Sequence, residues 1–244
     1  MHLIMQKIDG GRDLHETIYL DKYWSDIRTD SVDTGLRVKS KYTWEDEQGD
    51  VQCYTMPKTL KVHIALQMAR TLCELERVDI LHCDIKPCNF LVTRPAKEQG
   101  TLPCLKLIDF GEGNTPELAM GFVAGTPGYQ APEVVDDGLC SLWSEVFSVG
   151  VSLIELWTGR MWDGADTRGE GPPGMRVEML RALEKIQKAE PRVARLLRRC
   201  VDEEHEKRPS PKHMVKELYR IKLSSQRGVP RPPAPSGRGG GPRG

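Results

Sequence analysis

The stretch "ILHCDIKPCNFLV", residues 80–92, places a cluster of polar side chains between two apolar runs. The chemically active members of this cluster are His82, Asp84, Lys86 and Asn89. Polar groups at such short spacing, with apolar residues on both sides, indicate a loop whose flanks are buried and whose polar groups perform chemistry. Cys83, between the histidine and the aspartate, is the unexpected member of the loop.

Two further motifs follow this loop in order, "LIDFGEG" at 107–113 and "GTPGYQAPE" at 125–133. The runs "NFLV" and "LKLIDF", with a turn-rich segment between them, predict a small hairpin. In this order the three motifs resemble the signature set of eukaryotic protein kinases. The chain resembles the C-terminal lobe of that family to about residue 223. This implies an α+β fold, predominantly helical with short β-hairpins.

Length, composition and charge restrict the classes of protein to which this chain can belong. The 244 residues suffice for one large domain or two small ones, and 39% hydrophobic residues suffice for a packed core. The 35 basic and 35 acidic residues balance, so no global field indicates a specific nucleic-acid partner. No apolar run approaches the roughly 20 residues that span a bilayer. With no signal peptide recognisable at the start, we expect an intracellular protein, cytoplasmic or nuclear.

The seven cysteines are scattered, and no C-x-x-C occurs among them. Without this spacing a structural zinc site is not expected, and most of the thiols should be reduced and buried. The predicted domain organisation has two parts. A truncated kinase domain covers 1–223 and includes a polar insert at 21–57, in which "RVKSKYTW" and "VQCYTM" predict a second hairpin. The Pro/Gly/Arg-rich residues 224–244 are expected to be a disordered tail.

Helical periodicity is clear between the motifs and after them. The stretch 58–78 repeats apolar residues on one face, at Ile64, Met68, Leu72 and Leu75. The stretch 144–159 predicts a buried central helix that starts at Ser144 as N-cap and ends at Gly159. A third helix, within 176–190, is predicted to have one apolar face, formed by Val177, Leu180, Leu183 and Ile186. A last helix is predicted after Ser210.

The resemblance implies roles for the residues of the first motif and for their neighbours. Asp84 would accept or orient the proton of a substrate hydroxyl, and Lys86 would neutralise charge on the transferred phosphoryl group. Lysine at this spacing, and the third motif, are similar to serine/threonine kinases, so the expected partner is a protein substrate with Ser or Thr. Asn89 and Asp109 would hold Mg²⁺, which prefers oxygen ligands. Thr126 would bond toward Asp84 and Lys86 and shape the substrate groove.

The resemblance also implies structural residues. His82, Phe110 and Gly111 belong to the two loops that meet at the site, and His82 and Phe110 would pack there to position them. A histidine beside an apolar run is commonly a satisfied core residue, which agrees with this role. Glu133 would form a buried ion pair with Arg208.

Glu145 stands where the family has an aspartate that caps the backbone of the catalytic loop, which we define as residues 80–89. Glutamate is one methylene longer than aspartate. Whether its carboxylate reaches the loop backbone in the same way is left open by the sequence.

The stretch "LIMQKIDGGRDL", residues 3–14, resembles the kinase hinge that binds the adenine of ATP. Met5 would be the gatekeeper, and the backbone groups of Gln6 and Ile8 would face the adenine. Asp13 would contact the ribose, and Leu91 would form the apolar floor under the adenine. An ordinary strand and turn would also fit this stretch.

Cys83 departs from the family pattern, because an arginine that pairs with an activation-segment phosphate is usual at this position. A thiol cannot form such a charge-assisted bond. The activation segment, residues 111–131, offers hydroxyls only at Thr115, Thr126 and Tyr129. We therefore expect that an active form does not require a phosphate on this segment.

The larger departure concerns the N-terminal lobe, because no glycine loop or V-A-I-K lysine precedes the hinge. Two explanations remain open. The chain is a fragment of a working kinase, or it is a natural single-lobe pseudokinase that binds other proteins. In either case the lobe face that is left uncovered is a candidate docking surface for a partner.

Overall fold

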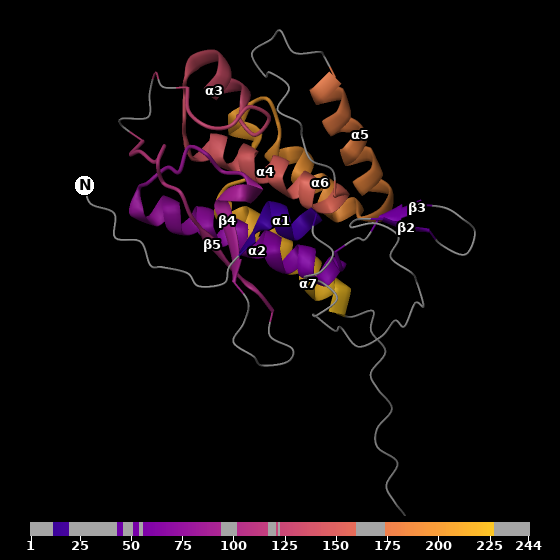
Figure 1. Ribbon diagram of the computed structural model, residues 1–244. Coiled ribbons are helices and arrows are strands. Elements are labelled where there is room, and N and C mark those ends of the chain that lie inside the picture. The colour runs from indigo at the N-terminus through magenta and orange to yellow at the C-terminus, as the bar shows by residue number, and fades with distance from the viewer. Residues whose placement is uncertain are drawn as a thin grey trace, which may run out of the picture.

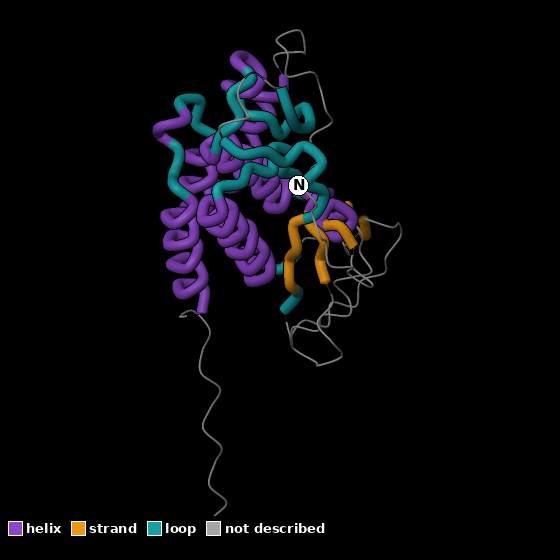
Figure 2. The backbone as a smooth tube through the Cα atoms, turned by 90° about the vertical axis from the view of Figure 1, so that its left-hand side faces the viewer, coloured by secondary structure: helices purple, strands orange, loops and turns teal. Residues whose placement is uncertain are grey.

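The computed structural model describes residues 12–19, 43–45, 51–53, 56–93, 102–116, 121, 123–159 and 174–226. Helices form most of this part of the chain, and the strands lie to one side of them (Figure 2). Met5, Gln6 and Ile8, the predicted gatekeeper and adenine-facing residues, lie outside the described residues. No helix in the described ranges combines the length and apolar character that crossing a bilayer requires.

Helix α2 (Lys58–Val78) has the bounds that its periodicity predicts. Its predicted face is buried, since Ile64, Met68 and Leu72 are fully shielded from solvent. This face contacts α4 and α7, and α2 runs beside α7 in the helical body (Figure 1). Asp79 is the C-cap of the helix, and its left-handed backbone (φ 53°) turns the chain directly into the catalytic loop.

Helix α4 (Leu142–Thr158) is the buried central helix, but it begins earlier than predicted. Ser141 is the N-cap, and the prediction of Ser144 was wrong. Ser144 is the third helical residue, and its hydroxyl accepts from the Ser141 backbone N–H at 2.9 Å. Both serines therefore form one reciprocal capping box, which the sequence pattern alone does not distinguish from a cap at Ser144. The predicted stop at Gly159 is confirmed, with φ 64°.

Helix α5 (Gly174–Ala189) buries only the second half of its predicted apolar face. Leu183 and Ile186 are buried, whereas Val177 and Leu180 are 43% and 45% exposed. The helix is confirmed, and the exposure of the latter two agrees with the first turns of α5, which extend away from the other helices (Figure 1). The spacing of apolar residues identifies one face of a helix, but the elements that pack against the helix decide how much of that face is buried.

The remaining helices complete the lobe. Helix α7 (Pro211–Gln226) starts after Ser210, whose hydroxyl accepts from the His213 backbone N–H at 3.3 Å, as the predicted N-cap requires. It continues to Gln226, beyond the predicted domain boundary. The others are α1 (Leu14–Tyr19), the 3-10 turn η2 (Pro87–Asn89), α3 (Pro132–Asp137), α6 (Pro191–Cys200) and the 3-10 turn η3 (His205–Lys207).

Both predicted hairpins are present. Strands β4 (Phe90–Thr93) and β5 (Cys104–Leu107) pair antiparallel, and β1 (Arg12–Asp13) joins the other edge of β4. Strands β2 (Thr43–Glu45) and β3 (Val51–Cys53) form the second hairpin, within the polar insert. The register pairs Phe90 with Leu107. The residues just before β4 and just after β5 therefore meet at one end of the sheet, and these are the first and second motifs.

Candidate active site

Three side chains form a closed triangle at the centre of the catalytic loop. Lys86 Nζ lies 2.7 Å from Asp84 Oδ2 and 2.6 Å from Thr126 Oγ1. The Thr126 hydroxyl donates to Asp84 Oδ1 at 2.7 Å, so both carboxylate oxygens are engaged. Thr126 comes from the activation segment, 42 residues after Asp84. The triangle thus joins two distant segments and holds a carboxylate and an ammonium group in fixed orientation.

Asn89 also orients this carboxylate. Its Nδ2 donates to the Asp84 carbonyl at 2.7 Å and to Asp84 Oδ2 at 3.0 Å. The short turn η2 and the buried position of Asn89 hold it there. Because the amide nitrogen faces Asp84, the amide oxygen is the atom left to face a cation.

Asp109 lies at the start of the second loop and is exposed. Its left-handed backbone (φ 62°) and a hydrogen bond from Gly111 N to Oδ1 (3.3 Å) shape the turn after β5. The backbone N–H of Ile108 donates to Asn89 O at 2.9 Å, which keeps the two motifs adjacent. Oxygen donors from Asn89 and Asp109 at one end of the sheet are the ligand type that Mg²⁺ prefers, so this donor set fits the ion.

His82 connects the catalytic loop to the second loop. Its ring is fully buried, and Nε2 lies 2.8 Å from the Ile108 carbonyl. Nδ1 accepts from the Asp84 backbone N–H at 3.3 Å, which is consistent with a neutral ring that carries its proton on Nε2. Burial lowers the pKa of His82 and favours this neutral form. The rings of His82 and Phe110 pack edge to face, with centroids 4.7 Å apart.

Glu145, at the start of α4, reaches the catalytic loop despite its extra methylene. Its Oε1 accepts from the backbone N–H groups of His82 and Cys83, both at 2.7 Å. Burial raises the pKa of this carboxyl group to about 8. Its other oxygen, Oε2, is buried and has no hydrogen-bond partner among the described residues. Glu145 therefore caps the catalytic loop through Oε1, which answers the question that the sequence left open. Its Oε2 makes no hydrogen bond to the described residues.

Glu133 and Arg208 form the ion pair that the resemblance implies. The guanidinium contacts both carboxylate oxygens, at 2.5 and 2.8 Å, and both residues are buried. Arg208 also donates to the carbonyl of Trp143, at the start of α4, and packs over the Phe147 ring. This bidentate pair ties α3 to the segment before α7.

Near the predicted nucleotide site, the structure pairs Asp13 with Leu91 across β1 and β4. Leu91 is half-buried. The two predicted neighbours of the nucleotide are thus brought to one place.

Sequence reasoning missed two features of the site. Tyr129 is buried, and its hydroxyl donates to Glu155 Oε2 at 2.5 Å, so this hydroxyl of the activation segment is sealed inside. Burial raises the pKa of Tyr129 well above its usual value. Cys140 was also missed, and its sulfur lies 2.9 Å from that of Cys83. The spacing of residues along the chain predicts neither contact, because the partners are 26 and 57 residues apart.

Gly125 marks a close approach between the activation segment and the catalytic loop, and it provides a test of that contact. A Cβ built at Gly125 would lie 2.7 Å from the Cys83 carbonyl oxygen, and the backbone is left-handed (φ 95°). Gly121 also has a left-handed backbone (φ 77°), but no described atom lies within 4 Å of its Cβ position. We expect Gly125→Ala to lower the free energy of unfolding by about 1–3 kcal/mol more than Gly121→Ala, the cost of overpacking.

Chemical denaturation of the two variants measures this difference. Gly121→Ala is the matched control, because it carries the backbone strain without the clash. Equal losses in the two variants would contradict the close approach at Cys83.

Comparison with known proteins agrees with this geometry. A model of the protein kinase domain family matches residues 45–220. Wall-associated receptor kinase-like 1 of Arabidopsis thaliana is 30% identical over 203 residues, which cover 74% of this chain and 26% of the relative. MAP3K epsilon protein kinase 1 of Brassica napus is 27% identical over 233 residues, covering 88% of this chain and 16% of the relative.

The motifs, the lobe that carries them and the match over residues 45–220 define the class of protein. The chain belongs to the protein kinase family, and its described part has the helical, kinase-like architecture of a C-terminal lobe. It spans about a quarter or less of the length of the relatives named above.

Proposed function

We propose that this chain is the C-terminal lobe of a serine/threonine protein kinase, which transfers the γ-phosphate of ATP to a protein hydroxyl. The observation that carries the proposal is the triangle of Asp84, Lys86 and Thr126, in which one carboxylate contacts an ammonium group and a hydroxyl. A further relative, "G-type lectin S-receptor-like serine/threonine-protein kinase SD1-13" of Arabidopsis thaliana, is 38% identical over 101 residues, covering 39% of this chain. Its name supports the Ser/Thr class.

Phosphoryl transfer depends mainly on positioning and on neutralising charge. In the proposed mechanism the Asp84 carboxylate orients the substrate hydroxyl and accepts its proton. The Lys86 ammonium group, 2.7 Å from that carboxylate, neutralises charge on the transferred phosphoryl group. Thr126 holds both groups and borders the place where the substrate hydroxyl enters.

Asn89 and Asp109 are the residues proposed to hold Mg²⁺, through the amide oxygen and the carboxylate. Bound Mg²⁺ would neutralise the phosphate oxygens of ATP. Asp13 and Leu91 are proposed to contact the ribose and the adenine. Met5, Gln6 and Ile8 complete the proposed nucleotide site from the hinge.

A second candidate function is a pseudokinase that binds proteins without transferring phosphate. It is favoured by one observation, that Cys83 stands in the catalytic loop where the family has an arginine. Kinases also use a G-x-G-x-x-G loop and a V-A-I-K lysine, parts that cover the phosphates and hold their position and that lie outside these 244 residues. A partner docked on the lobe face that these parts would otherwise cover belongs to this second proposal.

Both candidates lead to the same expectation for the isolated chain. Incubated with Mg²⁺, labelled ATP and a generic Ser/Thr protein substrate, the 244 residues should transfer no more phosphate than their Asp109→Asn variant. The physical reason is that the phosphates lack the covering loop and lysine. Transfer that depends on Mg²⁺ and is lost in Asp109→Asn would contradict this expectation.

The same assay separates the two functions. Any longer product of the same gene that contains a glycine loop and the lysine should transfer phosphate, and Asp84→Asn should abolish that transfer. A longer product that binds Mg²⁺ and ATP but transfers nothing would contradict the kinase proposal and favour the pseudokinase.

We propose an intracellular setting, cytoplasmic or nuclear. The support is that no disulfide joins the six cysteines within the described residues, as expected in a reducing compartment. The prediction that most of the thiols are buried was wrong, since only Cys140 and Cys200 of these six are buried. Intracellular ATP and Mg²⁺ would be available to the proposed site there.

A further inference from the structure

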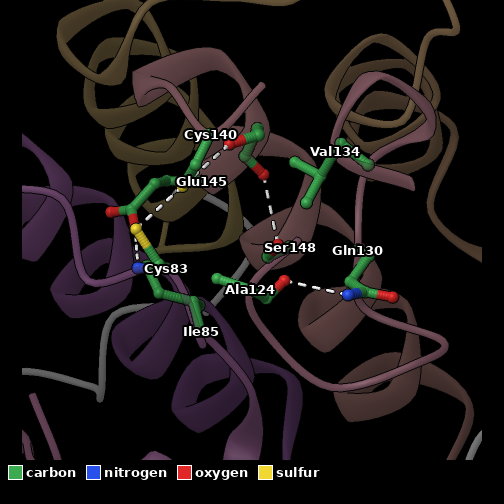
Figure 3. A pocket seen from close by; sticks show the side chains of 10 residues that line it. Cys83, Ile85, Ala124, Gln130, Val134, Cys140, Glu145 and Ser148 are labelled. Atoms are coloured by element: carbon green, nitrogen blue, oxygen red, sulfur yellow. Dashed lines mark hydrogen bonds between the residues drawn. The ribbon is translucent and has the colours of Figure 1, made fainter. Parts of the chain in front are cut away.

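A second cluster of polar side chains lies behind the catalytic loop. It consists of Cys83, Cys140 and Glu145, and the two sulfurs and one carboxylate oxygen all lie within 4.8 Å of one another. Figure 3 shows the three together at one side of a pocket, with Gln130 and Val134 on the other side. Cys140 and Glu145 are buried and Cys83 is half-buried. Capping of the loop by Glu145 Oε1 explains neither the two thiols nor Oε2.

The distance between the two sulfurs leaves two kinds of chemistry open. They lie 2.9 Å apart. A disulfide would bring them to about 2.05 Å. Two ligands of a tetrahedral zinc ion, with Zn–S bonds of about 2.3 Å, would be about 3.8 Å apart. The observed separation lies between these two values, so the third member of the cluster has to decide between them.

Glu145 Oε2 favours a bound cation. This oxygen is buried and has no hydrogen-bond partner among the described residues, and one oxygen of its carboxyl group lies within 4.8 Å of both sulfurs. Leaving a buried polar atom without a partner costs free energy, and a disulfide would give it none. A cation held by the two sulfurs and this oxygen gives it one. Glu145 Oε1 is anchored by two backbone N–H groups, the outer support typical of a ligating carboxylate.

We propose that Cys83 Sγ, Cys140 Sγ and Glu145 Oε2 bind a zinc-type divalent metal ion, with water from the pocket as the fourth ligand. Zinc accepts this mixture of sulfur and oxygen ligands in tetrahedral geometry. On binding, the two thiols and the Glu145 carboxyl group release the protons they carry to solvent, and metal–sulfur and metal–oxygen bonds form. The ion keeps its charge, and no electrons are transferred.

Such an ion would join two parts of the chain at the back of the active site. Cys83 belongs to the catalytic loop, Cys140 to the segment before α4, and Glu145 to the first turn of α4. At Cys83, where the family has an arginine that pairs with a phosphate, a bound metal ion would instead connect the catalytic loop to the start of α4. The absence of C-x-x-C argued against zinc, but these ligands meet only in the folded chain, because the two cysteines are 57 residues apart.

The test is metal binding by the whole chain, purified in reductant and stripped of metal with a chelator. After addition of Zn²⁺ and desalting, we expect one bound zinc per chain. Co²⁺ should give the thiolate-to-metal charge-transfer absorption and the strong d–d bands of a tetrahedral site. Cys140→Ser and Glu145→Gln should each weaken zinc binding by about tenfold or more, as even losses in the outer shell of metal sites do.

Cys104→Ser is the matched control, because Cys104 is exposed and outside the cluster. It should bind zinc as the unmodified chain does. Circular dichroism of each variant establishes that it is folded. Glu145→Gln keeps an oxygen for the two backbone N–H groups of the loop, so it separates metal binding from loop capping.

Two outcomes would overturn the proposal. One is zinc binding that Cys140→Ser and Glu145→Gln leave unchanged. The other is no zinc binding in reductant. If, in addition, peroxide removes two thiols that mass spectrometry maps to Cys83 and Cys140, the pair is a redox-active one instead. Neither outcome bears on phosphoryl transfer, which the separate ATP assay measures.

Discussion

Arg208→Met is expected to lower the free energy of unfolding by about 3–5 kcal/mol, the typical loss when one partner of a buried ion pair is removed. The arginine is 2% exposed and its partner Glu133 is 8% exposed, so the carboxylate left behind cannot recover its hydration. Methionine keeps much of the side-chain volume. The loss therefore reports the stranded charge and the lost hydrogen bonds rather than a cavity.

Denaturant unfolding at neutral pH measures this loss. Arg220→Met is the matched control, because Arg220 pairs with Glu217 on the exposed surface of α7 and is 59% exposed. An exposed pair of this kind contributes about 0.3–0.5 kcal/mol. The double variant Glu133→Gln with Arg208→Met should recover part of the loss, because no buried charge remains. Equal losses for Arg208→Met and Arg220→Met would contradict the structural role.

Glu145→Ala is the second substitution with a large expected effect, a loss of about 2–5 kcal/mol in the free energy of unfolding. The substitution leaves the backbone N–H groups of His82 and Cys83 without their acceptor at the buried base of the loop. Each buried donor left unsatisfied costs about 1–3 kcal/mol. The catalytic loop should also lose order, since its tie to α4 is removed.

Glu145→Gln is the matched control for this prediction, because the amide oxygen can still accept from both N–H groups. Measured with a chelator present to exclude any bound metal, it should retain most of the stability that Glu145→Ala loses. Amide hydrogen exchange at the loop should be faster in Glu145→Ala alone. If both variants were equally stable and equally protected, loop capping by this side chain would be ruled out.

The helices and hairpins of the lobe could be predicted because their signals are local. Helix α2 follows from apolar residues spaced along a single face, and β4 and β5 follow from two apolar runs around a turn-rich segment. The error in the start of α4 arose because a local pattern has two solutions, since Ser141 and Ser144 share one capping box. The spacing of apolar residues also does not tell how much of a helix face is buried, and Val177 on α5 is 43% exposed.

For the site, motif order and family resemblance indicated Asp84, Lys86 and Asn89 together, since they lie within one short loop. Their roles in phosphoryl transfer remain predictions. Thr126 was also expected near them, and its hydroxyl bonds Asp84 at 2.7 Å. The hinge residues Met5, Gln6 and Ile8 lie outside the described residues and also stay predictions.

The sequence by itself determined the family, the order of the motifs and most helices, because spacing along the chain carries that information. Only the tertiary structure decided that the longer Glu145 reaches the loop and that Cys83 meets Cys140. It also decided that the Tyr129 hydroxyl is sealed against Glu155. The physical reason is that these partners are far apart in the chain. Their contact depends on how α4 packs behind the catalytic loop, which no local pattern of residues specifies.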